Sequence, residues 1–321
     1  APPLAALETP PAERPPEKEP EKPPEKPAEK PAEKPPEKPA EKPVAKPATP
    51  PQLALVPAPA PGLIERGRLG PLPRVAPDGR APWRVYARPF DKSDSRPRIA
   101  LVIGNLGLSG AATEAAIQQL PGGVTLAFSP YAHGLEDYIS LARAAGHEVL
   151  LSLPMEAENL TPESGGAHTL LTVLSPSENL DRLSWLLSRF TGYVGATNYL
   201  GSRFTTSADN MLPILEELKE RGLLFLDSRS TDHSVTSRLA DQLRLPAVSN
   251  ERIIDTEASR AAIDQMLQAA EEEARAKGSS IAMGFPYPVT IERVAAWTAT
   301  LPDKGIALAP VSAMVRPRSG S

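Results

Sequence analysis

Residues 99–103 read Ile-Ala-Leu-Val-Ile, an apolar run with no polar interruption. A strand with one face in water alternates apolar and polar residues, whereas a strand buried on both faces of a parallel sheet is continuously apolar. In folds of this kind, the loops after the carboxyl ends of the strands carry the functional groups. Here that loop opens with Gly104 and Asn105, neither of which ionises. The run therefore predicts a doubly buried strand whose functional end carries no charge.

The rest of the chain repeats this arrangement, because apolar segments alternate with amphipathic ones. Further strands are predicted at 124–128, 149–153, 193–197, 223–227, 281–284 and 306–309, with a weaker one at 247–248. Helix starts are expected at Ser109, Ser177, Ser207 and Thr256, and a helix end at Gly278. Seven or so β-α units in about 215 residues favour an α/β domain with a parallel barrel or a doubly wound sheet.

Proline divides the chain into regions. Of the 39 prolines, most precede residue 62, where the tetrad Pro/Ala-Glu-Lys-Pro recurs. Each proline fixes φ and removes a backbone donor, so this composition favours an extended spacer over helix or sheet. We expect a disordered Pro-Glu-Lys spacer over 1–61, a connector over 62–97, a folded domain over 98–315 and a tail over 316–321.

Composition also excludes several classes of function. The chain has no cysteine, so disulfides and thiol chemistry are absent. A formal charge of -4 gives no support for a nucleic-acid partner. No apolar run reaches the roughly 18 residues of a membrane span. Because the numbering starts at Ala1, we expect any membrane attachment to come from an anchor upstream.

Six segments that cover most of 98–315 together resemble the divergent polysaccharide deacetylase family of the YibQ type, related to the NodB homology domain. They read IALVIGNLG from Ile99, VTLAFSPY from Val124, AGHEVLLSLPME from Ala145, GYVGATNYLGSRF from Gly192, RGLLFLDSR from Arg221 and GFPYP from Gly284. The resemblance implies a distorted (β/α)7 barrel of the polysaccharide-deacetylase type. It also implies a location in the bacterial periplasm or cell envelope and, in the family, metal-dependent removal of acetyl groups from amino sugars.

The chain departs from this family at the positions that carry its chemistry. Where the family reads I-D-D-L-G, Gly104 and Asn105 replace both aspartates. Ser152, Tyr199 and Phe285 stand where the family has the histidines of L-H-L-P-M-E, N-H-M-G-S and G-H-P. Hydrolysis of an amide in this way needs a metal-bound water, a carboxylate base and a proton donor. We therefore expect no cofactor and a domain that has kept its fold without its catalysis.

Polar and aromatic side chains still follow the predicted strands. The ligand-binding candidates are Asn105, Glu156, Asn198, Ser202, Arg203, Asp227, Ser228, Arg229 and Phe285. We expect them to bind glycan or a protein partner of the envelope. The alternative is an active deacetylase with a relocated site, in which Glu156 and Asp227 hold a divalent metal such as zinc through oxygen. A simpler interpretation is that Asp227 and Arg229 pair with each other or cap loops.

Aromatic residues and histidines carry weaker expectations. Phe285, with Tyr131 and Tyr199, could form a rim that stacks on sugar, although core packing explains Phe285 equally well. Trp185 and Trp297 fall on predicted helices and are expected to be packing residues. His147 is expected to cap a helix end. His133 and His168 lie in polar loops and are expected to be exposed.

Overall fold

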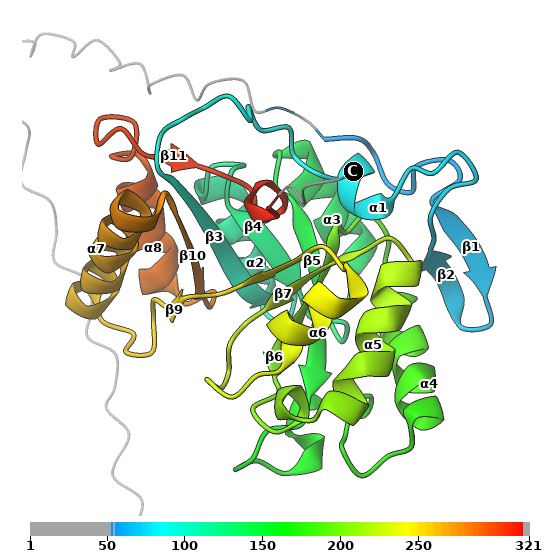
Figure 1. Ribbon diagram of the computed structural model, residues 1–321. Helices are drawn as coiled ribbons and strands as arrows, with labels where there is room; N and C mark the ends of the chain where they lie inside the picture. Colours follow the sequence, from blue (N-terminus) through cyan, green and yellow to red (C-terminus); the bar gives the residue numbers. More distant parts are fainter. Residues whose placement is uncertain (1–52, 54, 317–321) are drawn as a thin grey trace, which may run out of the picture. The chain divides into compact units, whose positions relative to one another are not determined.

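The computed structural model describes Leu53 and residues 55–316, without the side chains of Pro162 and Glu163 (Figure 1). Most of the predicted spacer and nearly all of the predicted tail therefore lie outside the described residues. Within those residues, no helix is both long and apolar enough to cross a membrane.

A parallel sheet of nine strands forms the centre of the domain, in the order β8-β7-β6-β5-β4-β3-β10-β9, with β11 paired to β3. Its strands are β3 (Arg98–Leu106), β4 (Thr125–Phe128), β5 (Val149–Met155), β6 (Gly195–Leu200), β7 (Leu224–Asp227), β8 (Ala247–Ser249), β9 (Arg252–Ile253), β10 (Ser279–Gly284) and β11 (Ala307–Leu308). The outermost strands of this order, β8 and β9, are separated in the chain only by Asn250 and Glu251. The sheet is thus curled into a half-barrel, and the predicted α/β class is confirmed.

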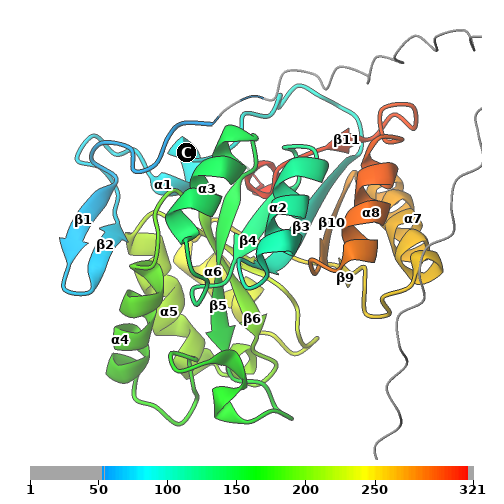
Figure 2. The ribbon, with the colours of Figure 1, turned by 180° about the vertical axis from the view of Figure 1, so that it is seen from behind.

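The helices are α1 (Pro82–Val85), α2 (Gly110–Gln119), α3 (Leu135–Ala144), α4 (Pro176–Leu187), α5 (Ala208–Glu220), α6 (Thr236–Leu243), α7 (Arg260–Lys277) and α8 (Pro288–Thr298), with short 3-10 helices at Pro162–Gly165, Phe204–Thr206 and Val311–Met314. Helices α2 to α8 follow the strands as predicted and pack on the outer face of the sheet (Figure 2), whereas α1 and the last 3-10 helix pack against the inner face. The N-caps expected at Ser109 and Ser207 are confirmed.

Two of the predicted helix starts were wrong. Helix α4 begins at Pro176, with Ser175 as its N-cap rather than the predicted Ser177, because Ser175 and Glu178 form a reciprocal capping box. Helix α7 begins after Ser259 rather than Thr256, because the Ser259 side chain accepts the backbone N–H of Ala262.

The two faces of the sheet have separate apolar cores. Ile99, Leu101 and Ile103 pack with the helices on the outer face, whereas Ala100 and Val102 point to the inner face. The inner core is completed by residues from outside the barrel, among them Leu63, Tyr86 and Val311. The connector and the C-terminal 3-10 helix therefore cover the apolar face that the helices leave bare.

A buried arginine on α3, Arg143, holds the connector against the domain through hydrogen bonds. The Arg143 guanidinium donates to the carbonyl oxygens of Val56, Tyr86 and Gly192 at 2.6–3.1 Å, and burial lowers its pKa to about 10. The Leu55 side chain is buried as well, so the packed part of the chain begins before residue 62.

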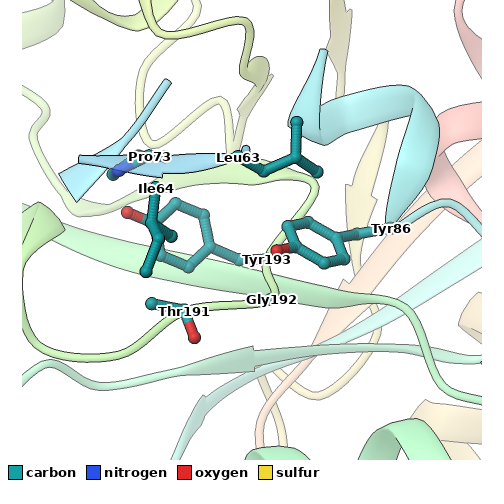
Figure 3. A pocket seen from close by; sticks show the side chains of 7 residues that line it. All are labelled: Leu63, Ile64, Pro73, Tyr86, Thr191, Gly192 and Tyr193. Carbon is teal, nitrogen blue, oxygen red and sulfur yellow. The ribbon is translucent and has the colours of Figure 1, made fainter. Parts of the chain in front are cut away.

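The connector also forms a two-stranded antiparallel hairpin, made of β1 (Ile64–Gly67) and β2 (Gly70–Pro73), which stands at the side of the domain (Figure 1). A hollow of about 10 Å³ lies beneath it, where Leu63 and Ile64 face Tyr86 and Tyr193 (Figure 3). That volume suits about one water molecule. The hollow is a packing defect rather than a ligand site.

A second buried ionisable side chain, that of Glu148, joins the connector to the C-terminal 3-10 helix at the amino ends of the strands. The carboxylate of Glu148, just before β5, accepts the backbone N–H groups of Arg88 at 2.8 Å and Ser312 at 3.1 Å, and the Ser312 hydroxyl. Glu148 is fully buried, and this desolvation raises its pKa to about 7.

We predict a pH dependence of stability from Glu148. The folded state holds the Glu148 proton more tightly than the unfolded state, whose carboxyl has a pKa near 4.5. The protonated group therefore makes its whole contribution to the free energy of unfolding below about pH 4.5. This contribution is lost as the pH rises to about 7, a loss of about 3 kcal/mol. Denaturant unfolding of the wild type and Glu148→Gln at about pH 5 and about pH 8 should show the wild type losing stability relative to the variant. An unchanged difference between the two proteins would contradict this assignment.

Candidate functional site

The positions at which the chain departs from the family motifs lie toward the carboxyl ends of the strands. A Cβ atom built on Gly104 would lie 4.0 Å from Cε1 of Phe285, so the ends of β3 and β10 adjoin. Ser152 on β5 lies beside Thr197 on β6, and Pro154 lies beside Tyr199, two residues further along. The sheet therefore brings these positions to one end of the barrel, as expected from parallel strands.

The carboxyl end of β3, which was predicted to be a loop from Gly104 onward, is strand with an unusual backbone. The pairing of β3 with β4 shifts register between Ile103 and Leu106, and Asn105 in this bulge has a φ of 57°. Asparagine tolerates this left-handed conformation better than most residues do. Asn105 is half-buried at the mouth of the barrel.

Glu156 joins two loops at the mouth. One of its carboxylate oxygens accepts both the backbone N–H and the hydroxyl of Thr172, each at 2.6 Å, and the other lies 3.5 Å from the Arg203 guanidinium. Its carbonyl oxygen accepts the N–H of Arg203, while the Ser202 hydroxyl accepts the N–H of Glu158. Glu156 thus holds the loop after β5 against the loop after β6.

Asn198 makes the corresponding link from β6 to β7. Its side-chain oxygen accepts the N–H of Ser228 at 2.8 Å, and its amide donates to the carbonyl of Leu200 at 2.8 Å. The carbonyl of Ser228 in turn accepts the side chain of Asn250, from the segment that crosses between the sheet edges. Asn198 and Ser228 therefore join the ends of β6 and β7 to the segment between β8 and β9.

Asp227 braces its own loop. It is buried, and its oxygens accept the N–H of Arg229 at 2.9 Å and the hydroxyl of Ser234 at 2.6 Å. The Arg229 side chain pairs with Asp232 at 2.8 Å, on the surface. The contacts match the simpler interpretation of Asp227 as a loop cap, while the two residues do not pair side chain to side chain.

These contacts bear on the metal that the resemblance implies. Zinc takes imidazole, thiolate or carboxylate ligands, and the glycine, asparagine, serine, tyrosine and phenylalanine at the family positions do not supply them. Among the described residues, no three His, Cys, Asp or Glu side chains form a group that could hold a metal ion. The carboxylates of Glu156 and Asp227 accept hydrogen bonds from different sets of loop residues and do not share a partner. The donor set at the mouth does not fit zinc.

One buried carboxylate at the end of the sheet, that of Asp255, was not predicted from the sequence. Asp255 follows the short strand β9, which was not predicted, and is 4% exposed. One oxygen accepts the N–H of Phe285 at 2.6 Å and the hydroxyl of Thr290 at 2.9 Å, while the other has no partner. Burial raises its pKa. Asp255 ties the end of β9 to the end of β10.

One expectation about the histidines was wrong, and another holds at a different helix. His147 contacts the end of α2 rather than that of α3, which it follows: its ring is fully buried, with its nitrogens 2.8 Å from the carbonyl oxygen of Val124 and 3.2 Å from that of Ile117, in the last turn of α2. His168 is not a free loop residue, because its ring stacks on Trp185 with centroids 3.7 Å apart. His133 is exposed, as expected.

Aromatic side chains at the mouth fall into two groups. The rings of Phe285 and Tyr287 lie 6.4 Å apart at the end of β10, and Tyr287 is 46% exposed. Tyr131, which was expected on the same rim, instead packs 5.6 Å from Trp185. Trp297 is a packing residue, as expected, and donates to Glu271.

The chain resembles known proteins over the same region. A family model described as divergent polysaccharide deacetylase matches residues 101–315. An uncharacterized protein of Haemophilus influenzae is 28% identical over 212 residues, which are 66% of this chain and 74% of the relative. Uncharacterized protein YibQ of Escherichia coli is 27% identical over 195 residues, 60% of each chain. The crystal structure of an uncharacterized Agrobacterium tumefaciens protein has a TM-score of 0.75 at 34% identity, with coverage of 77% of this chain and 100% of that one. The resemblance predicted from the sequence is confirmed, and with it the fold type.

The space at Gly104 generates a prediction. Its nearest side-chain and backbone neighbours allow a Cβ atom at ordinary contact distance, whereas a Cβ atom at Gly195 on β6 would lie 2.1 Å from the carbonyl oxygen of Leu224. Gly104→Ala should therefore fold with nearly unchanged stability, and Gly195→Ala should lose at least about 2 kcal/mol. Urea unfolding of both variants tests this. Equal losses would show that Gly104 is itself required by packing.

Proposed function

The chain belongs to the divergent polysaccharide deacetylase family, and from this premise we propose that it is a catalytically degenerate member that binds glycan at the carboxyl ends of its strands. The support is chemical. The mouth keeps the family's strands and loops, but its donor set does not fit the metal. The carboxylates that remain there accept hydrogen bonds from their own loops.

The main support for a glycan ligand is the position of Phe285. It stands where the family has a histidine, beside Gly104, and together with the exposed Tyr287 forms an aromatic surface at the end of β10. Aromatic rings stack on the apolar face of a sugar, and a tyrosine adds a polar group at the edge of that contact. The replacement of histidine by phenylalanine thus exchanges a metal ligand for a stacking surface.

The proposal places the protein in the bacterial periplasm or envelope, where glycan or an envelope protein is the partner. In this view the Pro-Glu-Lys region acts as a spacer between the domain and its attachment, since proline-rich chains are extended. The domain itself binds no cofactor.

We predict that Tyr287→Ala and Phe285→Ala weaken the binding of N-acetylated chito-oligosaccharides by about tenfold each, because one stacking contact is removed. Isothermal titration calorimetry measures this directly. Leu141→Ala is the matched control, since Leu141 is 54% exposed on α3 and away from the mouth. Absence of binding by the wild type, or equal affinity of all three variants, would overturn the proposed function.

A second prediction concerns the metal. Gly104→Asp, Asn105→Asp, Tyr199→His and Phe285→His together should give the protein measurable zinc affinity, because carboxylate and imidazole ligands are placed at strand ends of the mouth. Calorimetry with zinc on the wild type and on the fourfold variant compares the two, and circular dichroism checks that the variant is folded. A folded variant without zinc affinity would contradict the assignment of these positions.

A further inference from the structure

A second hollow, of about 130 Å³, lies between the connector hairpin and α4, on elements that carry none of the mouth residues. The residues that line it are Arg68 and Leu69 of the hairpin turn, Leu72 of β2, and Asp181 and Ser184 of α4. A cavity of about 150 Å³ in a protein interior can hold benzene. The second hollow therefore suits a small molecule, or the end of a larger one, of about amino-acid size.

The hairpin is fixed against α4 beside this hollow. A Cβ atom on Gly70, where φ is 145°, would lie 3.1 Å from the carbonyl oxygen of Ser188, so β2 begins in close contact with the end of α4. Leu72, two residues further along β2, is 9% exposed and packs in the outer core. Asp181 and Ser184 precede Ser188 on α4 and are three residues apart, so they share a face of the helix. The walls of the hollow are therefore held by packing before any ligand binds.

Opposite charges line the hollow without pairing. Arg68 and Asp181 both border it, yet they form no ion pair with each other. Among the residues that the structure describes, neither side chain has another hydrogen-bond or ion-pair partner. Glu65 on the same hairpin is different, because it pairs with Arg221 at 3.0 Å. The guanidinium of Arg68 thus keeps its N–H donors, and the carboxylate of Asp181 keeps its acceptors, for groups that enter the hollow.

We propose that the second hollow binds a zwitterionic ligand of amino-acid size, with its ammonium group on Asp181 and its carboxylate on Arg68. A guanidinium binds a carboxylate through paired N–H donors, and an ammonium group donates to a carboxylate. A ligand with only one of the two charges leaves the opposite wall of the hollow without a partner.

The remaining lining residues define the rest of the ligand. Leu69 is 46% exposed and Leu72 lies beside it in the hollow, so an apolar side chain of the ligand would remove apolar surface from water. The Ser184 hydroxyl can contact either charged group, because a hydroxyl both donates and accepts. The lining thus favours an apolar amino acid, and this site does not rest on the proposed glycan binding.

Titration of the full chain with L-leucine tests the site, with the backbone ¹H–¹⁵N signals of Leu69 and Ser184 as the readout. Both signals should shift in a saturable way. Leucinamide lacks the carboxylate and N-acetyl-leucine lacks the ammonium group, so each should bind at least about threefold more weakly, a modest factor because the charged groups are exposed. Absence of a saturable shift with leucine, or equal affinity for all three compounds, would overturn the proposal.

Variants of the lining residues test the same site from the side of the protein. Arg68→Gln and Asp181→Asn should each weaken leucine binding by at least about threefold, because a charge-assisted hydrogen bond is lost. Ser184→Leu should abolish binding, because the larger side chain fills the hollow. Arg66→Gln is the matched control, since Arg66 is an exposed arginine of the same hairpin that does not line the hollow.

Arg66→Gln should leave the affinity for leucine unchanged, and an equal loss in this control would overturn the proposal. Tyr287→Ala should also leave leucine binding unchanged, because Tyr287 lies at the end of β10. A protein that binds leucine but no chito-oligosaccharide would contradict the proposed function alone, whereas the reverse result would contradict only the zwitterion site.

Discussion

The parallel sheet buries side chains on both of its faces, and the molecule depends on covering the face that its helices leave bare. Leu63 and Tyr86 from the connector and Val311 from the C-terminal 3-10 helix complete that inner core. Arg143 and Glu148 hold these segments in place through backbone groups. A buried charge is tolerated only with such partners, so the covering segments are fixed at defined points rather than by apolar contact alone.

At the opposite end of the barrel, buried polar groups also need hydrogen-bond partners, and different residues provide them. There the strand ends carry Glu156, Asn198 and Asp227, and each accepts backbone or hydroxyl donors from a neighbouring loop. Buried donors and acceptors at strand ends need partners whether or not the site is catalytic. The mouth is therefore ordered by hydrogen bonds of the protein itself, and this order does not depend on ionisable side chains at Gly104 and Phe285.

The main strands and the positions at the mouth were predictable from local sequence patterns. The continuous apolar runs identified the main strands, and the quoted motifs placed Ser152, Tyr199 and Phe285 at one end of a barrel, where the structure has them. The roles of Asp255 and His168 were not predictable. Asp255 follows a strand of two residues, too short to show periodicity, and His168 acquires its stacking partner from a helix that begins eight residues later.

The sequence by itself determined the α/β class, the order of the strands along the chain, the family resemblance and the positions at which the chain departs from the family motifs. These follow from residue type and spacing, which act locally. Only the tertiary structure decided which polar side chains are engaged: it bonds Glu156 to Thr172, and it places Tyr131, His168 and Arg189 against Trp185. Such contacts join residues far apart in the chain, and their partners are fixed by how loops pack across strand ends rather than by any local pattern.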